Sequence, residues 1–373
     1  MRFLVINWRD IKNPEAGGAE IHLHEIFKRI AQDNHQVTLL ASKYKGCKKE
    51  EIIDGIRVIR IGTKFTFFFF VFLYYITKFR KYNFDYVIDD ISKMPLFTPL
   101  YVKKPLIAII HHIHGKTLFK ELPFILAITV YLCERLIPLF YKKVPIVTVS
   151  ESTKKELLFK GFSRDYIEIV YNGVNNNLFV PGTKSKKELI IYVGRVKKYK
   201  QLEDLIKAFK IIKENGKNPE LIIAGRGDYH EELRELVKKL NLDSNSVKIY
   251  KNITEQEKVS ILQRGWVYVI TSMKEGWGLS LIEANACGTP TIAYNIPGLQ
   301  DSVKNGKTGL LVKNGDINKL ANTIDKVLSD TELREKLTDN TTSWARNFDW
   351  DKSSKQFLRL VFNYEKHYNR AKF

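Results

Sequence analysis

The sequence is poor in cysteine and in long uninterrupted apolar runs, and it has fewer acidic than basic residues. Its three cysteines, Cys47, Cys133 and Cys287, are odd in number and widely spaced. This pattern fits neither a disulfide scaffold nor a zinc site, and it predicts a protein of the reducing cytoplasm. The first residues, MRFLVINWRD, lack the apolar core and cleavage site of a signal peptide and predict a buried strand.

Acidic residues are outnumbered by basic ones, 41 to 61, which gives a formal net charge of +20. The excess is spread over both halves of the chain and does not form a basic tail. No recognisable nucleic-acid-binding module accompanies it, so we expect no nucleic-acid partner. The charge favours anionic partners in general, such as a phosphorylated substrate or an anionic lipid surface.

Length and composition predict a globular protein of two domains, since 373 residues exceed one ordinary core and no low-complexity tract interrupts the chain. Short β-branched runs alternate with helical patterns in both halves, which predicts an α/β fold with two Rossmann-like doubly wound sheets. The expected strands are RFLVINW, QVTLLAS, IRVIRI, DYVIDD, PLIAIIHH, PIVTVS and IEIVYNGV, followed by ELIIYVGRV, LIIAGRG, SVKIYKN, VYVITS, TPTIAYN and GLLVKNG.

The domain boundary is expected in a linker at residues 175–187, where Asn, Pro, Gly and Lys replace the apolar pattern. We assign residues 1–178 to an N-terminal domain, 179–350 to a C-terminal domain and 351–373 to a C-terminal helix. Ligands of open parallel sheets bind beyond the carboxyl ends of the strands. Two such sheets facing each other would therefore place their strand-end loops on opposite sides of one cleft.

Two segments of the first domain, residues 64–82 and 122–144, are unusually apolar and aromatic. Neither has the roughly 18 to 20 uninterrupted apolar residues that span a bilayer, and Glu134 and Arg135 break the second. Both end in basic clusters, which is typical of elements that lie in an anionic membrane interface. The alternative is a crossover helix that packs on its own sheet, with cations at its carboxyl end.

The stretch MKEGWGLSLIEANACGTP sets Glu275 in a loop after a strand and Glu283 in the helix that follows, with Gly288 and Pro290 ending that helix. A glycine-lined loop entering a helix is a site for phosphate. Carboxylates repel phosphate but accept hydrogen bonds from vicinal diols, such as those of ribose and hexose. The alternative is that both acids are solvent-facing, although the apolar neighbours of Glu283 indicate that it needs a partner.

Cations suited to a diphosphate follow another strand, in VGRVKKYKQLEDLIKAF. Arg195 can bind two phosphate oxygens with its fork, and Lys200 can supply a point charge. Lys197 and Lys198 fit a solvated basic turn equally well.

Two further strand-end groups lie in the first domain. Gly17 and Gly18 precede a helix, and paired glycines let a ligand approach the backbone. His111, His112 and His114 end another strand. A histidine there that donates a hydrogen bond to a sugar hydroxyl is more economical than a metal site, and we expect no metal.

Taken together, these motifs resemble the retaining glycosyltransferases of family 4, which have the GT-B fold of two Rossmann-like domains across a cleft. EGWGLSLIEANACGTP is similar to the family's Glu-x7-Glu signature, VGRVKKYKQLEDLIKAF to its Gly-Arg…Lys segment and NPEAGGAEIHLHEIFKRIA to its Gly-Gly loop. VYNGV and the strand-end HH also match the family's pattern, and FDWDKSSKQFLRLVFNYEKHY looks like its terminal helix, which crosses back onto the first domain. The resemblance extends from Phe3 to about Trp350.

The resemblance implies an acceptor-binding N-terminal domain and a C-terminal domain that binds a nucleotide-diphosphate sugar of UDP or GDP type, with no cofactor. Glu275 would contact the transferred sugar, Glu283 the ribose, and Arg195 with Lys200 the diphosphate. The doubled histidine leaves His111, our preference, or His112 as the family's histidine near the sugar. The catalytic candidates are thus Glu275, Arg195, Lys200 and His111, and the donor-binding candidates are Gly17, Gly18, Arg195, Lys200, Gly276, Trp277, Gly278, Leu279 and Glu283.

The predicted function is metal-independent, retaining transfer of a hexose to a hydroxyl of a lipid-linked or other membrane-associated glycan, at the cytoplasmic face of an anionic membrane. The alternatives are another GT-B activity, namely nucleotide-sugar epimerisation or glycogen-type synthesis, and a non-catalytic sugar-nucleotide-binding protein.

Overall fold

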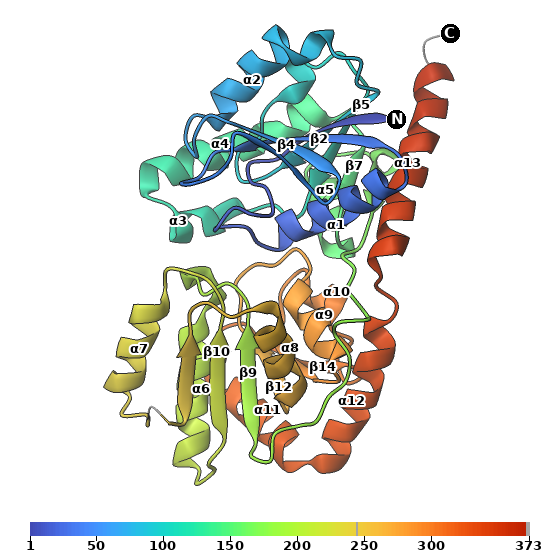
Figure 1. Cartoon of the computed structure of the whole chain (residues 1–373). Coiled ribbons are helices and arrows are strands. Elements are labelled where there is room, and N and C mark those ends of the chain that lie inside the picture. The colour runs from blue at the N-terminus through green and yellow to red at the C-terminus, as the bar shows by residue number, and fades with distance from the viewer. Residues whose placement is uncertain (244, 371–373) are drawn as a thin grey trace. The chain divides into compact units, whose positions relative to one another are not determined.

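The computed structural model describes residues 1–243 and 245–370, with the side chains of 365–370 left out of the description. The chain divides into two units, residues 1–173 with 350–373 and residues 174–349 (Figure 1). The second unit starts a few residues before the boundary predicted after residue 178. The N–H of Val174 donates to the carbonyl of Phe348 over 3.3 Å, which places the start of the linker in the second unit. Residues 371–373 of the predicted C-terminal helix lie outside the described residues.

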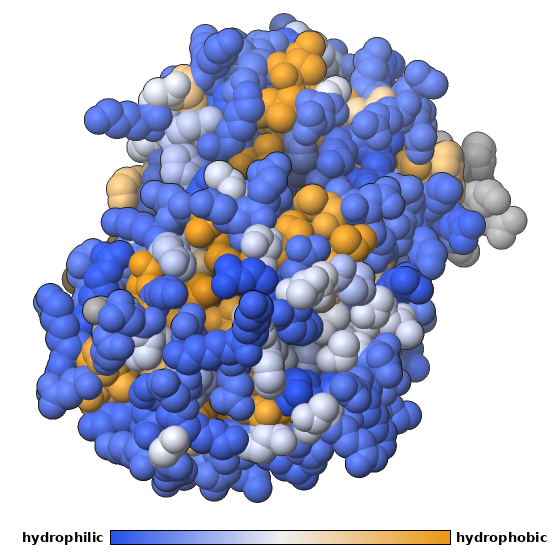
Figure 2. Space-filling view, turned by 60° about the horizontal axis from the view of Figure 1, so that its bottom comes forward, coloured by the Kyte–Doolittle hydropathy of each residue, from blue (hydrophilic) through white to orange (hydrophobic). Residues whose placement is uncertain are grey.

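The surface is hydrophilic over most of the face drawn in Figure 2, where hydrophobic residues form separate patches. Large exposed hydrophobic residues occur in both units. In the first unit they concentrate on α2 (Phe67–Thr77) and α4 (Phe124–Tyr141), the two segments that the sequence singles out as apolar.

The first unit is built on a sheet of eight strands in the order β3-β4-β2-β1-β5-β6-β7-β8, of which only the β3–β4 pair is antiparallel. Runs of β-branched residues form the buried strands, as expected for parallel strands covered on both faces. The strands are β1 (Arg2–Ile6), β2 (Gln36–Ser42), β3 (Glu50–Ile53), β4 (Ile56–Ile61), β5 (Tyr86–Ile91), β6 (Leu106–Ile110), β7 (Ile146–Thr148) and β8 (Ile167–Ile169).

Sequence reasoning missed β3. This strand lies at the sheet edge and reads EEII, with Ile52 76% exposed, so it has no apolar run to reveal it. Asp54 and Gly55, both at positive φ, form the tight connection to β4. An Asp-Gly pair between two short runs is a strong hairpin signal, and it was available in the sequence.

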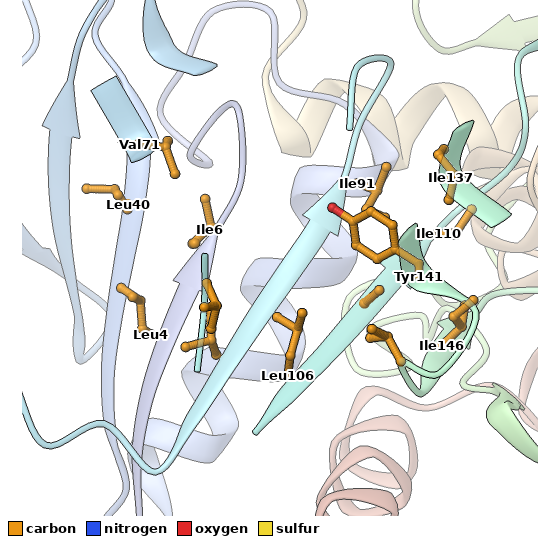
Figure 3. Packing of buried hydrophobic residues seen from close by; sticks show 14 of the residues in the cluster. Leu4, Ile6, Leu40, Val71, Ile91, Leu106, Ile110, Ile137, Tyr141 and Ile146 are labelled. Atoms are coloured by element: carbon orange, nitrogen blue, oxygen red, sulfur yellow. The ribbon is translucent and has the colours of Figure 1, made fainter. Parts of the chain in front are cut away.

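Helices cover both faces of this sheet, and alternate residues of each strand point to opposite faces. On one face, α2 and α4 share a buried cluster with the strands, in which Val71 of α2 lies near Leu40 and Ile6. Ile137 and Tyr141 of α4 lie near Ile110 and Ile91 (Figure 3). On the other face, α1 and α13 pack against strand residues that include Phe3 and Val5. The helices and helical turns are α1 (Gly18–Gln32), α2, η1 (Phe79–Lys81), η2 (Thr98–Leu100), η3 (Gly115–Thr117), α3 (Leu118–Glu121), α4, α5 (Glu151–Phe159), η4 (Arg164–Tyr166) and α13 (Trp350–Arg370).

The second unit is a fully parallel sheet of six strands in the order β11-β10-β9-β12-β13-β14. All six were expected from the sequence. The strands are β9 (Leu189–Val193), β10 (Glu220–Ala224), β11 (Val247–Tyr250), β12 (Val267–Ile270), β13 (Thr291–Tyr294) and β14 (Gly309–Val312). The helices are η5 (Lys198–Lys200), α6 (Leu202–Glu214), α7 (His230–Lys239), α8 (Glu255–Arg264), α9 (Leu279–Ala286), α10 (Leu299–Ser302), α11 (Ile317–Ser329) and α12 (Thr331–Ala345).

A buried ion pair fixes the loop that leads from β1 to α1. The guanidinium of Arg60 on β4 donates to both carboxylate oxygens of Asp10, over 2.7 and 2.9 Å, and neither side chain is exposed to solvent. Glu51 on β3 accepts a third hydrogen bond from Arg60, over 2.6 Å. Burial alone would lower the pKa of Arg60, but its hydrogen bonds to Asp10 and Glu51 outweigh burial and raise it.

A buried carboxyl group joins β5 to α4. Asp89 accepts hydrogen bonds from the hydroxyls of Thr98 and Tyr141, and it has no exposed surface. Burial, together with the nearby charge of Asp90, outweighs these hydrogen bonds and raises the pKa of Asp89 to about 6. The folded protein therefore holds this proton at pH values where the unfolded chain has lost it.

Because the folded-state pKa of Asp89 is raised, its contribution to stability is present at low pH and is lost as pH rises through about 6. Between pH 4.5 and 7.5 this loss amounts to about 2 kcal/mol of the free energy of unfolding, and we expect Asp89→Asn, which keeps an acceptor for Thr98 and Tyr141, to abolish it. Urea denaturation across that range, with exposed Asp165→Asn as the control, measures the difference. Equal pH dependence in wild type and Asp89→Asn would contradict the prediction.

Candidate active site

Three neighbouring strands of the second unit, β9, β12 and β13, deliver their carboxyl-terminal loops to one edge of the sheet. Arg195 and Lys200 follow β9, and Glu275 follows β12. Gly298, after β13, packs against the Glu275 loop so closely that a Cβ atom would lie 2.3 Å from the Glu275 carbonyl oxygen. The parallel topology thus brings the predicted candidates Arg195, Lys200 and Glu275 to the same edge.

Lys200 and Glu275 form a largely buried ion pair. The Lys200 ammonium donates to Oε1 of Glu275, and the Ser272 hydroxyl donates to the same oxygen over 2.6 Å. Burial alone would lower the pKa of Lys200, but the opposite charge of Glu275 outweighs it and raises that pKa. Lys200 therefore stays charged in a poorly solvated position. Its ammonium has three N–H groups, so pairing with Glu275 need not use all of them.

Tyr199 connects the two cations. Its hydroxyl accepts a hydrogen bond from Arg195 over 2.7 Å, and the Arg195 guanidinium and the Lys200 ammonium lie 5.8 and 5.1 Å from its ring centre. The Tyr192 hydroxyl donates to the Arg195 carbonyl over 2.8 Å, which fixes the backbone at the strand end. Sequence reasoning named both cations but neither tyrosine, because their role depends on ring positions that a motif does not encode.

Glu283 lies in α9, is 5% exposed and pairs with Lys258 of α8 over 2.7 Å. Burial raises the pKa of Glu283, and the charge of Lys258 opposes that effect. The expectation that this carboxylate needs a partner is confirmed, although sequence reasoning missed the partner itself. Lys258 lies on a different helix, and no local pattern links it to Glu283.

The loop between the two glutamates is held by packing. Trp277 is 2% exposed, and its ring lies 5.0 Å from that of Phe348. Gly278 precedes α9 at φ +89, a conformation that glycine adopts without strain. The side chain of Trp277 is thus part of the core, whereas the predicted contribution of residues 276–279 to donor binding is through their backbone.

In the first unit, α1 begins at the Gly17–Gly18 turn and carries His22 against His111 about one turn later. These two rings are 5.1 Å apart, and Nε2 of His111 lies 3.0 Å from Oδ1 of Asp90 on β5. Burial alone would lower the pKa of His111, but Asp90 outweighs it and raises that pKa. A Cβ atom on Gly18 would meet no heavy atom within 4 Å, so its backbone is open to approach.

His112 is half-buried, and its ring lies 4.4 Å from that of His114. Asp90 and His22 constrain the position of His111, which was not foreseen from the sequence. Within the part of the chain that the structure describes, no group of three or more His, Cys, Asp or Glu side chains is placed to hold a metal ion.

Comparisons with known proteins assign the family. The model described as "Glycosyltransferase Family 4" matches residues 16–178, and "Glycosyl transferases group 1" matches residues 174–344. The chain belongs to the family 4 glycosyltransferases. It is 30% identical to a Staphylococcus aureus capsular polysaccharide biosynthesis glycosyltransferase, CapM, over 55% of this chain and 52% of that protein. It is 28% identical to an uncharacterized glycosyltransferase of Methanocaldococcus jannaschii, over 59% and 60% of the two chains.

Solved structures share the fold of the chain along nearly its whole length. A sucrose-phosphate synthase from Thermosynechococcus elongatus aligns with a TM-score of 0.83 at 21% identity, over 98% of this chain and 99% of that one. HepE of Anabaena, solved with UDP-glucose, aligns with a TM-score of 0.76 at 18% identity, over 97% and 100%. At these identities the likeness concerns the fold alone. The fold class is therefore GT-B, as predicted.

The contact between Gly298 and Glu275 can be tested by adding one methyl group. Gly298→Ala places a Cβ atom against the Glu275 backbone at φ +85, so we expect it to lower the free energy of unfolding by about 3 kcal/mol or more. Gly306→Ala is the matched control, because Gly306 has φ +76 but no heavy atom within 4 Å of the added Cβ position. Denaturation curves would show equal losses if the close approach were unimportant.

Proposed function

We propose that this protein is a retaining glycosyltransferase that moves a hexose from a nucleoside diphosphate sugar to a hydroxyl of a lipid-linked or other membrane-associated glycan. The observation that carries this proposal is the convergence of Arg195, Lys200 and Glu275 at the carboxyl edge of β9 and β12. Two cations that share an aromatic ring, beside a carboxylate, offer partners for a diphosphate and for a polyol on the same edge of the sheet.

The chemistry then depends mainly on stabilising charge. As the bond between the anomeric carbon and the phosphate oxygen breaks, negative charge develops on the diphosphate, and Arg195 and Lys200 would stabilise it without a metal ion. The acceptor oxygen forms the new bond on the same face of the sugar, and the acceptor's proton passes to the leaving diphosphate. Glu275 would hold the sugar hydroxyls and Glu283 the ribose. The roles of Gly17, Gly18, His111 and His112 in the first unit stay predictions.

Binding of the donor can be tested without knowing the acceptor. We expect one of UDP, GDP, ADP or dTDP to raise the melting temperature selectively, and Glu283→Gln to weaken that nucleotide about tenfold or more, because a carboxylate accepts stronger hydrogen bonds than an amide. Glu231→Gln, a change of an exposed glutamate on α7 of the same unit, is the control. No stabilisation by any of the four at millimolar concentration would contradict the proposal.

Membrane contact is supported by the outer side of the first unit. We call the exposed apolar side chains of α2, of α4 and of Phe65, two residues before α2, the α2–α4 surface. Segment 97–101 links the two helices, because the Tyr101 ring lies 5.1 Å from Phe72 and the Phe97 ring 5.2 Å from Phe140. The surface comprises Phe65, Phe69, Phe70, Phe72, Leu73, Ile76, Phe124, Ile125, Leu126, Ile128, Leu132, Leu136 and Leu139, which are between 37% and 79% exposed.

Exposed cations accompany this surface, namely Lys78, Arg80 and Lys81 after α2 and Lys142 and Lys143 after α4. This arrangement suits an anionic bilayer, with apolar side chains below the headgroups and cations among them. We propose that the protein docks there, at the cytoplasmic face of the membrane.

Among the described residues, α4 is the one helix that could cross a membrane by length and composition, with 22% of its apolar window buried, and one such helix is weak evidence. Contacts within the first unit favour docking over crossing. Ala127, Ile137 and Tyr141 of α4 are buried, and Glu134 accepts hydrogen bonds from the N–H groups of His114 and Gly115 over 2.7 and 2.9 Å. A helix bound into its own domain in this way is available to a bilayer on its outer side only.

Flotation with lipid vesicles tests docking. We expect the protein to bind phosphatidylglycerol-containing vesicles better than phosphatidylcholine vesicles. The triple variant Phe69→Ser/Ile125→Ser/Leu139→Ser should reduce binding about tenfold or more, because each exposed apolar side chain that would transfer into the interface is removed.

Phe67, which the sequence grouped with its exposed neighbours, is fully buried and is left unchanged. Phe362→Ser on α13 is the control, since Phe362 is 46% exposed on a helix of the opposite sheet face. Unchanged binding by the triple variant would contradict docking through the α2–α4 surface.

A further inference from the structure

Lys258 is the one partner of Glu283 that the described residues provide, and its environment is unusual for a lysine. Its ammonium lies 2.7 Å from Oε1 of Glu283 and 3.4 Å from Oε1 of Glu255, and its side chain is 17% exposed. It also lies 5.0 Å from the ring centre of Phe179. These contacts therefore hold the ammonium in one position, unlike that of a solvent-exposed lysine.

The two oxygens of Glu283 differ. Oε1 accepts the hydrogen bond from Lys258, whereas Oε2 is buried and has no hydrogen-bond partner among the described residues. A buried polar atom without a partner is costly, and such an atom in a native protein calls for an explanation. An oxygen fixed in place and left without a donor is suited to a ligand hydroxyl.

Stability alone does not explain this pair. Replacing a buried ion pair with apolar residues of similar volume is often neutral or stabilising, so such a pair is weak evidence for a purely structural role. The unpartnered Oε2 makes the pair still less favourable for folding. The arrangement is better explained by a ligand that supplies the missing donors.

We propose that Lys258 is a positioning residue of the donor site, which holds Glu283 as an ionised, acceptor-only carboxylate and thereby makes the site selective for nucleoside diphosphates that carry both ribose hydroxyls. This inference rests on the proposed function, in which Glu283 binds the ribose. The ribose hydroxyls donate to Oε2 and to the remaining lone pair of Oε1. Lys258 also offsets the negative charge of Glu283, which would otherwise repel the diphosphate.

Removing the ammonium should change the protonation of Glu283. The titratable groups that face it are Lys258 and Glu255 of α8, Cys287 at the end of its own helix and Tyr268 of β12. Burial raises the pKa of Glu283, and the Lys258 charge is what opposes it. Without that charge, burial and the like charge of Glu255 act together, so the carboxyl group takes up a proton more readily. A protonated carboxyl group donates one hydrogen bond and no longer accepts equally at both oxygens.

The test is the affinity ratio of a ribonucleotide to its 2′-deoxy counterpart, for the nucleotide that stabilises wild type most (UDP with dUDP, GDP with dGDP or ADP with dADP). By isothermal titration calorimetry from pH 6 to 8.5, wild type should bind the ribonucleotide about tenfold or more tightly than its 2′-deoxy counterpart at every pH. A ratio of this size is the loss of affinity expected for one charge-assisted hydrogen bond. In Lys258→Met we expect this ratio to fall several-fold at pH 6 and to recover partly toward pH 8.5. Lys258→Arg should keep the wild-type behaviour.

The controls distinguish the positioning role of Lys258 from ribose binding by Glu283, on which that role rests. Lys184→Met removes another half-buried lysine of the same unit, which donates to Thr289, and should leave the ratio unchanged. If Lys258→Met does not fold, Lys258→Gln removes the charge with a smaller change in polarity. An unchanged ratio in the Lys258 variants with a reduced ratio in Glu283→Gln would overturn the role of Lys258 alone. An unchanged ratio in Glu283→Gln would overturn ribose binding by Glu283 and this inference with it.

Discussion

Two buried lysine–glutamate pairs are the constraint on which the second unit's site depends. Lys200 with Glu275 joins the loop after β9 to the loop after β12, and Lys258 with Glu283 joins α8 to α9. A charge in a poorly solvated position must be paired, and removing one partner leaves the other uncompensated. Each pair therefore fixes the positions of two elements at once. The same pairs keep each of the two carboxylates beside a cation.

Helix α4 of the first unit distributes polarity differently from an ordinary surface helix. The buried stripe of α4 includes a carboxylate, Glu134, and the helix ends in Tyr141, which donates to buried Asp89, whereas most of its exposed side chains are apolar. An amphipathic surface helix normally places its polar residues outward. The inversion costs free energy in water, because exposed apolar area remains hydrated. It is consistent with an outer medium of low polarity, which is the physical reason for proposing a membrane.

The sequence was sufficient for the parallel strands, since parallel strands buried on both faces read as β-branched runs, and for the placement of Arg195, Lys200 and Glu275 at one sheet edge, since strand-end loops of one parallel sheet meet there. It was insufficient where the role of a residue depends on its contacts with other residues in the folded structure. Lys258 lies 25 positions before Glu283 on another helix. Tyr199 acquires its role from the two cations that flank its ring. Phe67 and Phe69 are alike in sequence, yet one is core and the other is 65% exposed, because helical position decides which residue faces the sheet.

A connection within the first unit follows from the position of Glu134. Its carboxylate holds the N–H groups of His114 and Gly115, so the backbone that follows the histidines is bound to the helix that carries half of the α2–α4 surface. Burial raises the pKa of Glu134, and these two N–H groups oppose that effect, so the carboxylate and the loop stabilise each other. A force that shifts α4 must move this loop or break two hydrogen bonds to a buried carboxylate. Because breaking them would leave that carboxylate without partners, movement of helix and loop together is the less costly response.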